Sequence, residues 1–334
     1  SYEEQDDVKK DYLNLIYENN NVPERRVHSG DFIGPSSMSL ETKNILPIDI
    51  DSNVPNINKP YTVTDKADGA RKLLYISKIG KIYLINTNMN VQFTGSVTKN
   101  KKNFNSILDG EHILYDKKGN FINLYACFDI YFKNNKNLMM YPFISFDGIV
   151  YNSDNIEKDI FRWNEMSKFN NELNQECIIS NYENCVKIKT KTFYSNIDSD
   201  IFKQCKKILD GVEDETMFEY ETDGLIFTPC DKSVGSELVG EKLEPNKRTW
   251  NYSLKWKPSE FNTIDFLVTT KKDDNGEDFI GNIFEDGNNM ASSSQVNQYK
   301  TLVLRVGFDE RKHGFINPCE DILKKNFPKY KDFS

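Results

Sequence analysis

Short runs of apolar and β-branched residues, separated by turn formers, dominate the chain after residue 60. Two such runs are Lys72–Ser77 and Lys81–Asn86, and the Lys-Ile-Gly between them predicts a β-hairpin. Ser106–Tyr115 predicts a strand pair or one bulged strand, and Asn123–Phe132 and Ile144–Tyr151 predict further strands. We therefore expect mainly β-structure in this part of the chain.

Apolar residues at helical spacing predict two helices in the middle of the chain. Asp159–Phe169 has this spacing. Ser199–Asp210 also has it, and adds a Ser or Asp start and Gly211 directly after its end. Nearer the N-terminus, Asp11–Tyr17 fits either a short amphipathic helix or a linker, and the sequence leaves both interpretations open.

Strand patterns return in the last third of the chain. Gly224–Thr228 and Trp250–Lys257 have strand character, and Pro258 ends the second of them. Thr263–Thr270 opens a section with strand patterns only, and Tyr299–Phe308 is its clearest later strand. The pattern therefore changes near residue 263, which favours a second domain there.

The length of 334 residues also suggests two domains, and the content of 38% hydrophobic residues indicates a folded protein. The net charge is −8, from 43 basic and 51 acidic residues. An acidic protein of this kind is not a general coat for nucleic acid. Any polyanion that it binds must be met by a local basic cleft.

Six cysteines are scattered along the chain, and none forms a Cys-x-x-Cys pair. With only three histidines, this pattern argues against structural zinc and favours a reducing compartment. We see no signal peptide or transmembrane run, so we expect a cytoplasmic protein with no membrane partner. The first residue is Ser rather than Met, so we expect a piece of a longer polypeptide.

The richest segment for chemistry is Thr64-Asp-Lys-Ala-Asp-Gly-Ala-Arg71, which follows the apolar and β-branched run at residues 61–63. Lys66 at the end of a strand can act as a nucleophile when its amine is neutral, and Arg71 adds a fixed positive charge. The alternative is a hairpin turn with solvated charges. The segment alone does not decide between them.

Later segments supply complementary groups. Glu111 follows Asp109-Gly110, and Asp223 precedes Gly224. The carboxylates of both residues could act as oxygen ligands of a divalent metal. Lys255 and Lys257 alternate on a strand, so both point to one face and suit phosphate oxygens. Phe128 offers a ring on which a base could stack.

Each of these groups also has an ordinary structural explanation. An Asp-Gly pair is usually a turn, a lone Phe is usually core, and alternating lysines usually form a solvated strand face. Asp147-Gly148 resembles the Asp223 segment, yet no lysine pair follows it closely, and we interpret it as a structural turn.

Five ordered motifs resemble the covalent nucleotidyltransferases, which comprise mRNA capping guanylyltransferases and ATP-dependent DNA and RNA ligases. The resemblance spans about residues 30 to 267. The motifs are Lys66-Ala-Asp-Gly-Ala-Arg71, Leu108-Asp-Gly-Glu111, Phe128-Asp-Ile, Thr222-Asp-Gly-Leu-Ile-Phe and Leu254-Lys-Trp-Lys-Pro258.

Within that superfamily the chain looks like a capping guanylyltransferase. The run Asp-Gly-Leu-Ile-Phe-Thr-Pro, the run Leu-Lys-Trp-Lys-Pro and the upstream Gly34-Pro-Ser-Ser-Met-Ser-Leu have the capping form. The segments around Lys66 and Leu304-Arg-Val-Gly-Phe-Asp are similar to the multifunctional capping enzymes of large DNA viruses. That likeness implies triphosphatase and methyltransferase domains as partners, and a viral factory or virion as the location.

The resemblance implies a two-step reaction. Lys66 attacks GTP, and the resulting lysyl-N-GMP then passes GMP to the 5′-diphosphate end of an RNA. Arg71 would contact the ribose, and Glu111 the ribose or a metal site. Phe128 would stack on guanine, and Asp223 would help to place Mg²⁺ or Mn²⁺. The α-phosphate would be held by Lys255 and Lys257.

The implied architecture is an α+β fold. It consists of an N-terminal linker or helix over residues 1–30 and a nucleotidyltransferase domain (ATP-grasp-like or DNA-ligase-like) with antiparallel sheets over residues 31–262. A partial OB-fold lid over residues 263–334 would follow. The family's sixth, basic motif is missing, because Asp309-Glu-Arg-Lys312 does not match it. We therefore expect weak self-guanylylation by this chain alone.

Two alternatives remain beside the guanylyltransferase. An ATP-dependent DNA or RNA ligase would carry the same motifs and would differ in the nucleotide that labels it. A non-catalytic scaffold or binding module with this fold would bind no nucleotide covalently. All five motifs keep their charged residues, which argues against this alternative.

Overall fold

A computed structural model of the chain describes residues 2–19, 22–47, 52–179, 185–197, 199–243, 248–261, 267–284 and 296–305. The chain divides into two units, Ser1–Phe261 and Asn262–Ser334, and each is described by itself. The expected division into residues 1–30, 31–262 and 263–334 stays a prediction.

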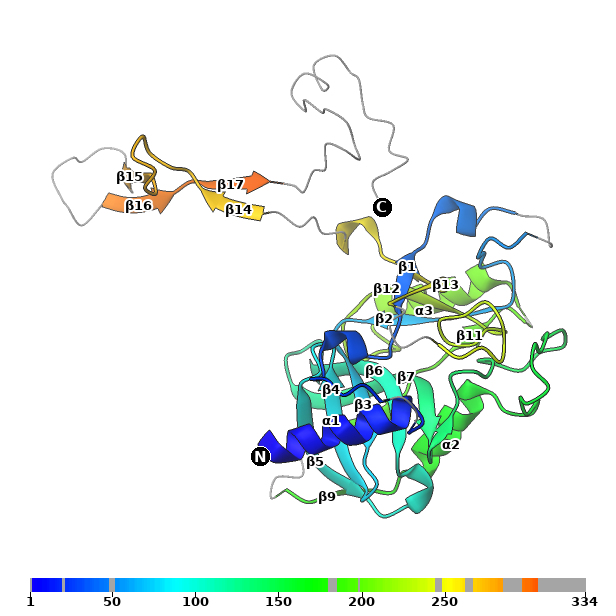
Figure 1. The fold of residues 1–334 in the computed structure, drawn as a ribbon. Coiled ribbons are helices and arrows are strands. Elements are labelled where there is room, and N and C mark those ends of the chain that lie inside the picture. Colours follow the sequence, from blue (N-terminus) through cyan, green and yellow to red (C-terminus); the bar gives the residue numbers. More distant parts are fainter. Residues whose placement is uncertain are drawn as a thin grey trace. The chain divides into compact units, whose positions relative to one another are not determined.

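The first unit contains an eight-stranded sheet (Figure 1). The strand order is β10-β7-β6-β3-β4-β5-β9, and β8 pairs with β7. Every pairing is antiparallel except that of β10 with β7. The strands are β3 (Ala70–Ile76), β4 (Lys81–Asn86), β5 (Val91–Thr98), β6 (Ser106–Tyr115), β7 (Phe121–Lys133), β8 (Lys136–Asn137), β9 (Gln175–Cys177) and β10 (Lys187–Thr190).

A five-stranded sheet in the same unit has the order β1-β13-β12-β2-β11. Its first strand is parallel to β13, and the other neighbours are antiparallel. The strands are β1 (Ser36–Ser39), β2 (Tyr61–Ala67), β11 (Tyr194–Ser195), β12 (Thr222–Pro229) and β13 (Thr249–Trp256). The fold is thus mixed α/β with largely antiparallel sheets.

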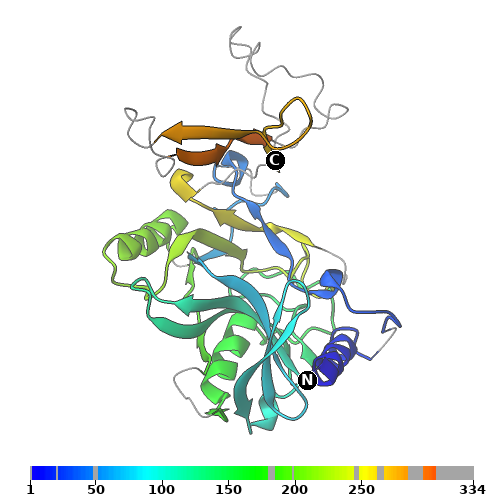
Figure 2. The same ribbon diagram turned by 90° about the vertical axis from the view of Figure 1, so that its left-hand side faces the viewer.

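Helices cover both faces of the eight-stranded sheet (Figures 1 and 2). Alternation along β3 sends Leu73 and Tyr75 into the core cluster that α1 (Tyr2–Ile16) joins, and sends Leu74 and Ile76 into the cluster that α2 (Arg162–Glu172) joins. The helix α3 (Ile201–Glu213) packs against β2 of the other sheet. Short 3₁₀ helices cover Ser29–Asp31, Thr42–Asn44, Lys101–Asn103 and Ser259–Phe261.

Several expected elements are confirmed. The predicted hairpin is β3 paired with β4, in which Lys72 lies opposite Asn86. Ser106–Tyr115 is one strand with irregular register against β7, so the bulged-strand interpretation holds. The side chain of Asp200 caps the start of α3, as expected. The helix continues past Gly211, however, and ends at Glu213. Gly211 is therefore a buried residue within the helix and not the residue that ends it.

Of the two interpretations left open for Asp11–Tyr17, the helix is confirmed. Most of the segment belongs to α1, a 15-residue helix that ends at Ile16, and Val8, Tyr12 and Leu13 are buried in the first core cluster.

The strand predicted at Ile144–Tyr151 is wrong. Its Asp147-Gly148 pair forms a turn, and Val150 is exposed instead of packing against a sheet.

The second unit contains two small antiparallel sheets. One pairs β14 (Leu267–Thr270) with β17 (Leu302–Arg305), and the other pairs β15 (Ile280–Phe284) with β16 (Val296–Lys300). The single strand expected at Tyr299–Phe308 is therefore divided at Thr301. The start of the strand expected at Thr263, and Asp309–Lys312, lie outside the described residues.

One pair of cysteines is bonded, which the expectation of scattered thiols did not include. Cys177 and Cys185 form a disulfide, with their Cα atoms 6.1 Å apart. Cys127, Cys205 and Cys230 are free.

Among the helices in the described ranges, none has the length and the apolar character needed to cross a membrane.

Arg162 of α2 is among the largest fully buried side chains of the described residues. Its Nε donates to Asp129 Oδ1 at 2.8 Å, its Nη2 donates to Asp129 Oδ2 at 3.2 Å, and its Nη1 donates to the carbonyls of Tyr141 and Lys232. This buried cation therefore ties α2 to β7 and to the loops beside it. Removing one partner of such a pair leaves an uncompensated buried charge.

We predict that Arg162→Met lowers the free energy of unfolding by about 3–5 kcal/mol, because Asp129 stays buried without its counter-ion. Urea denaturation measures this change. The matched control is Lys168→Met on the same helix, which breaks an exposed pair with Glu165 and should cost less than about 1 kcal/mol. Equal losses in the two variants would contradict this account of Arg162.

Candidate active site

A cavity of about 250 Å³ lies in the first unit, and residues of both sheets line it. Five of the seven predicted site residues line this cavity: Lys66, Arg71, Glu111, Phe128 and Lys255. The other two, Asp223 and Lys257, reach the site through ion pairs described below. The sequence motifs therefore converge on one place.

The Asp68-Gly69 step connects the two sheets instead of forming a hairpin. Strand β2 ends at Ala67 and pairs with β12 and β11, whereas β3 begins at Ala70 and pairs with β4 and β6. The hairpin-turn interpretation of this segment is therefore wrong. As a result, Lys66 and Arg71 line the same cavity from different sheets.

One carboxylate binds the predicted nucleophile and a second lysine. Lys66 Nζ lies 2.6 Å from Asp223 Oδ1, and Lys257 Nζ lies 2.5 Å from Asp223 Oδ2. Burial opposes the charged carboxylate, but hydrogen bonds from Lys257 and Lys66 outweigh it and lower the pKa of Asp223. Lys66 thus has both a carboxylate partner in Asp223 and a positive neighbour in Lys257, which shares that carboxylate.

Gly224 explains how β13 comes close enough for that contact. It lies within β12 at a φ of +141°, where the pairing of β12 with β2 is irregular. A Cβ at this position would lie 1.9 Å from the carbonyl oxygen of Trp256. The Asp223-Gly224 pair is therefore not a turn but a point where two strands approach closely, and it brings Lys257 to Asp223.

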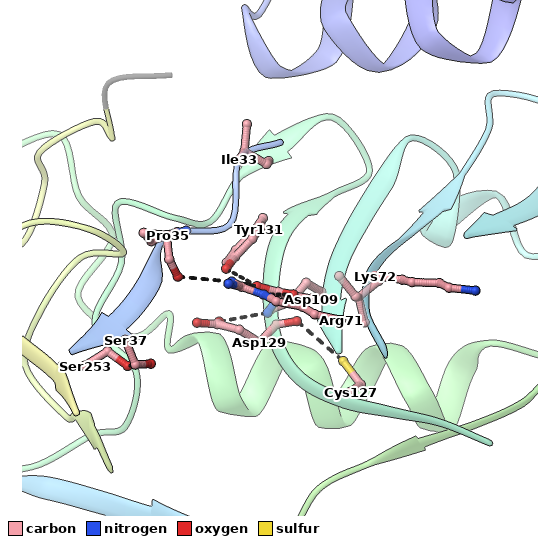
Figure 3. Close-up of polar contacts among 12 residues, drawn as sticks. Ile33, Pro35, Ser37, Arg71, Lys72, Asp109, Cys127, Asp129, Tyr131 and Ser253 are labelled. Carbon is pink, nitrogen blue, oxygen red and sulfur yellow. Dashed lines mark hydrogen bonds and ion pairs between the residues drawn. The ribbon is translucent and has the colours of Figure 1, made fainter. Parts of the chain in front are cut away.

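Arg71 is held by a buried carboxylate that the sequence analysis did not single out (Figure 3). Its Nε and Nη2 donate to Asp109 at 3.1 and 2.6 Å, and Tyr131 Oη donates to the same carboxylate at 2.5 Å. Asp109 is the first acid of the Leu108-Asp-Gly-Glu111 motif. Its place in the same motif as Glu111 is the sequence feature that could have predicted a role for it at the site. The charged end of Arg71 also lies 5.8 Å from the centre of the Phe128 ring.

Glu111 is mostly buried beside several charges. Burial raises its pKa to about 7, while Lys191, Lys66 and Arg71 lower it and Asp109 raises it. Its side chain lines the cavity together with Arg71, which lies opposite it on β3. The carboxyl group therefore changes charge near neutral pH.

Lys191 lines the cavity and was missed by the sequence analysis. Its Nζ lies 3.0 Å from Asp65 Oδ2 and donates to the Asp65 carbonyl, and its side chain is only 4% exposed. It stands in the alternating run Lys187-Ile-Lys-Thr-Lys191, which resembles a solvated strand face. Nothing in that local pattern distinguishes a buried lysine.

The described residues contain no group of three or more His, Cys, Asp or Glu side chains that could hold a metal by themselves. Mg²⁺ needs no such group, because it is commonly bound by one or two carboxylates together with substrate phosphates and water. Asp223 and Glu111 provide oxygen ligands of that kind. The residues present thus fit a cation that arrives with a nucleotide.

Lysines and carboxylates thus meet in one cavity of a mixed α/β fold. The family model for the catalytic domain of the mRNA capping enzyme matches residues 2–258. The chain therefore belongs to the family of mRNA capping enzyme catalytic domains, which are guanylyltransferases.

A protein of Acanthamoeba polyphaga mimivirus named "Probable mRNA-capping enzyme" is 25% identical over 297 residues. The match covers 82% of this chain and 24% of that relative, so the chain spans about a quarter of the relative's length.

Similar solved structures include two ligases. A mycobacterial DNA ligase D has a TM-score of 0.40 and 11% identity, over 72% of this chain and 65% of that one. The ligase domain of M. tuberculosis LigD has a TM-score of 0.38 and 11% identity, over 77% and 66%.

We predict that Glu111 makes stability depend on pH. Its pKa of about 7 in the folded state exceeds the ordinary value of 4.5, so its stabilising contribution is full below pH 4.5 and is lost as the pH rises through 7. Relative to Glu111→Gln, the unaltered chain should lose about 3 kcal/mol of unfolding free energy across this window. Urea denaturation in metal-free buffer measures the difference.

The control for that experiment is Glu219→Gln, which changes a carboxylate paired with Lys189 at the surface. It should keep a constant offset from the unaltered chain across the same pH range. A constant offset for Glu111→Gln as well would show that Glu111 does not titrate there.

Proposed function

We propose that this chain transfers GMP from GTP to RNA through a covalent intermediate on Lys66. The amine of Lys66, after losing a proton, forms a P–N bond to the α-phosphorus of GTP. The bond between the α-phosphorus and its bridging oxygen to the β-phosphate breaks, and pyrophosphate leaves. In the second step, the terminal oxygen of a 5′-diphosphate RNA displaces Lys66 and takes the GMP.

The observation that carries this proposal is the position of Lys66. Its side chain is partly buried at a cavity, its ammonium is hydrogen-bonded to Asp223, and Lys257 shares that carboxylate. A lysine kept only for packing or solubility has no need of this arrangement. For the reaction, Lys66 must give up its proton and leave Asp223.

The other predicted residues take roles that suit their places. Lys255, which lines the cavity, and Lys257 would hold the phosphates as negative charge spreads over their oxygens. Arg71 and Glu111 would contact the ribose, and Phe128 would stack on guanine. Asp223 and Glu111 would hold Mg²⁺ or Mn²⁺, which when bound supplies positive charge beside the phosphates.

We further propose that residues 263–334 contribute an OB-fold lid that closes over GTP and opens for RNA. Triphosphatase and methyltransferase domains in the same polypeptide or complex would supply the diphosphate RNA end and consume the capped product. Without the sixth basic motif, this chain alone should form the GMP adduct slowly.

Incubation with labelled GTP and a divalent metal should label the chain, and Lys66→Ala should abolish the label, because the proposal assigns the P–N bond to the amine of Lys66. The matched control is Lys72→Ala, whose side chain points away from Arg71 (Figure 3) and which should keep the label. Gel electrophoresis measures the covalent product. Labelled ATP should leave no adduct.

Survival of the adduct in Lys66→Ala would refute the assignment of the nucleophile. Labelling by ATP and not by GTP would indicate a polynucleotide ligase instead. No label from either nucleotide, even in a longer polypeptide, would favour a binding module.

A further inference from the structure

The segment Asp31–Pro35, called the strap here, contacts Arg71 through Phe32 and Pro35. Arg71 Nη2 donates to the carbonyl oxygen of Pro35 at 3.1 Å, and the Phe32 ring centre lies 5.5 Å from the Arg71 guanidinium carbon. At Gly34 the contact is so close that a Cβ would lie 2.5 Å from Arg71 Nη2. The strap thus helps to set the position of the guanidinium.

The hydrogen bonds of Arg71 leave one nitrogen for a ligand. A guanidinium has five N–H donors, and here Nε and Nη2 donate to Asp109 and to the Pro35 carbonyl. Within the described ranges, Nη1 has no protein acceptor, and Arg71 lines the cavity. The strap and Asp109 therefore together engage Nε and Nη2 of Arg71 and hold the guanidinium in one orientation at the cavity.

Tyr12 of α1 fixes the strap on both sides of Phe32. Its hydroxyl donates to the carbonyl oxygen of Asp31 at 2.7 Å and accepts from the backbone N–H of Ile33 at 3.2 Å. The side chain is fully buried, with its ring packed edge-on against Tyr75. One hydroxyl group therefore joins the N-terminal helix to the residues that contact Arg71.

We propose that Tyr12 is a positioning residue for ribose recognition, acting through the strap on Arg71. The inference rests on the proposed function, in which Arg71 contacts the ribose. It assigns to α1 a part in substrate binding, whereas the sequence analysis described residues 1–30 only as a linker or a helix.

The test compares GTP with 2′,3′-dideoxy-GTP, which lacks the ribose hydroxyls. Isothermal titration in EDTA gives the dissociation constant of each nucleotide without chemistry. Tyr12→Phe should weaken GTP binding about three- to tenfold, the range of one hydrogen bond, and leave binding of the dideoxy nucleotide within about twofold. The preference for GTP should therefore fall.

Arg71→Lys provides the reference, because a lysine cannot reproduce the fork of donors. The double variant Tyr12→Phe with Arg71→Lys should have the same preference as Arg71→Lys alone, since Tyr12 acts through Arg71. Gly34→Ala is a second, independent variant, and its added methyl group should displace the guanidinium and lower the same preference.

Two tyrosines supply matched controls at the same helix interface. Tyr83→Phe removes a hydroxyl that donates to Glu4 of α1 at 2.9 Å. Tyr75→Phe removes a buried hydroxyl that has no hydrogen-bond partner in the described structure. Both variants should keep the preference of the unaltered chain for GTP.

Equal weakening of both nucleotides by Tyr12→Phe, or an unchanged preference with a lower melting temperature, would overturn the inference and leave Tyr12 a structural role only. Additive losses in the double variant would also overturn it. Failure of the unaltered chain to bind GTP at all would instead refute the proposed function, and the inference with it.

Discussion

The chain passes from the five-stranded sheet to the eight-stranded sheet in two residues, Asp68 and Gly69, and the candidate active-site cavity depends on this short connection. Lys66 lies before the crossing and Arg71 lies after it, so a segment of six residues contributes to both sheets at the cavity. The backbone N–H of Asp68 donates to the carbonyl of Glu221 at 2.9 Å, which fixes the crossing to the residues before β12. The short connection therefore keeps the backbone positions of Lys66 and Arg71 close together, and ion pairs with Asp223 and Asp109 hold their charged groups.

Charge is concentrated around this crossing although the protein as a whole is acidic. Four cations and two carboxylates line the cavity: Lys66, Arg71, Lys191, Lys255, Glu111 and Asp129. Most of the cations are already hydrogen-bonded to acids, as Arg71 is to Asp109 and Lys66 is to Asp223. These carboxylates therefore keep Arg71 and Lys66 from being buried as unpaired charges.

The sequence predicted much of the site because each motif joins a charged side chain to a strand pattern. Lys66, Arg71, Glu111, Phe128 and Lys255 could be named from such motifs, and they meet at one cavity. The β3–β4 hairpin was predictable for the same reason, since two alternating runs flank a short turn.

The remaining features depend on contacts between residues far apart in the sequence. Arg162 is a buried ion-pair partner on a helix. An arginine on the exposed face of a helix would have the same neighbours in the sequence, so the burial of Arg162 could not be predicted. The hydroxyl of Tyr12 reaches a segment nineteen residues away, and nothing near Tyr12 in the sequence indicates that contact. The strand predicted at Ile144–Tyr151 failed because apolar residues alone do not specify a pairing partner.

The central claim is that Lys66 carries the nucleotide. Mass spectrometry of the protein after incubation with GTP and Mg²⁺ or Mn²⁺, followed by peptide mapping, tests it most directly. The account predicts a gain equal to one GMP on the peptide that contains Lys66. A GMP gain on a different residue, or an AMP gain from ATP with none from GTP, would contradict it.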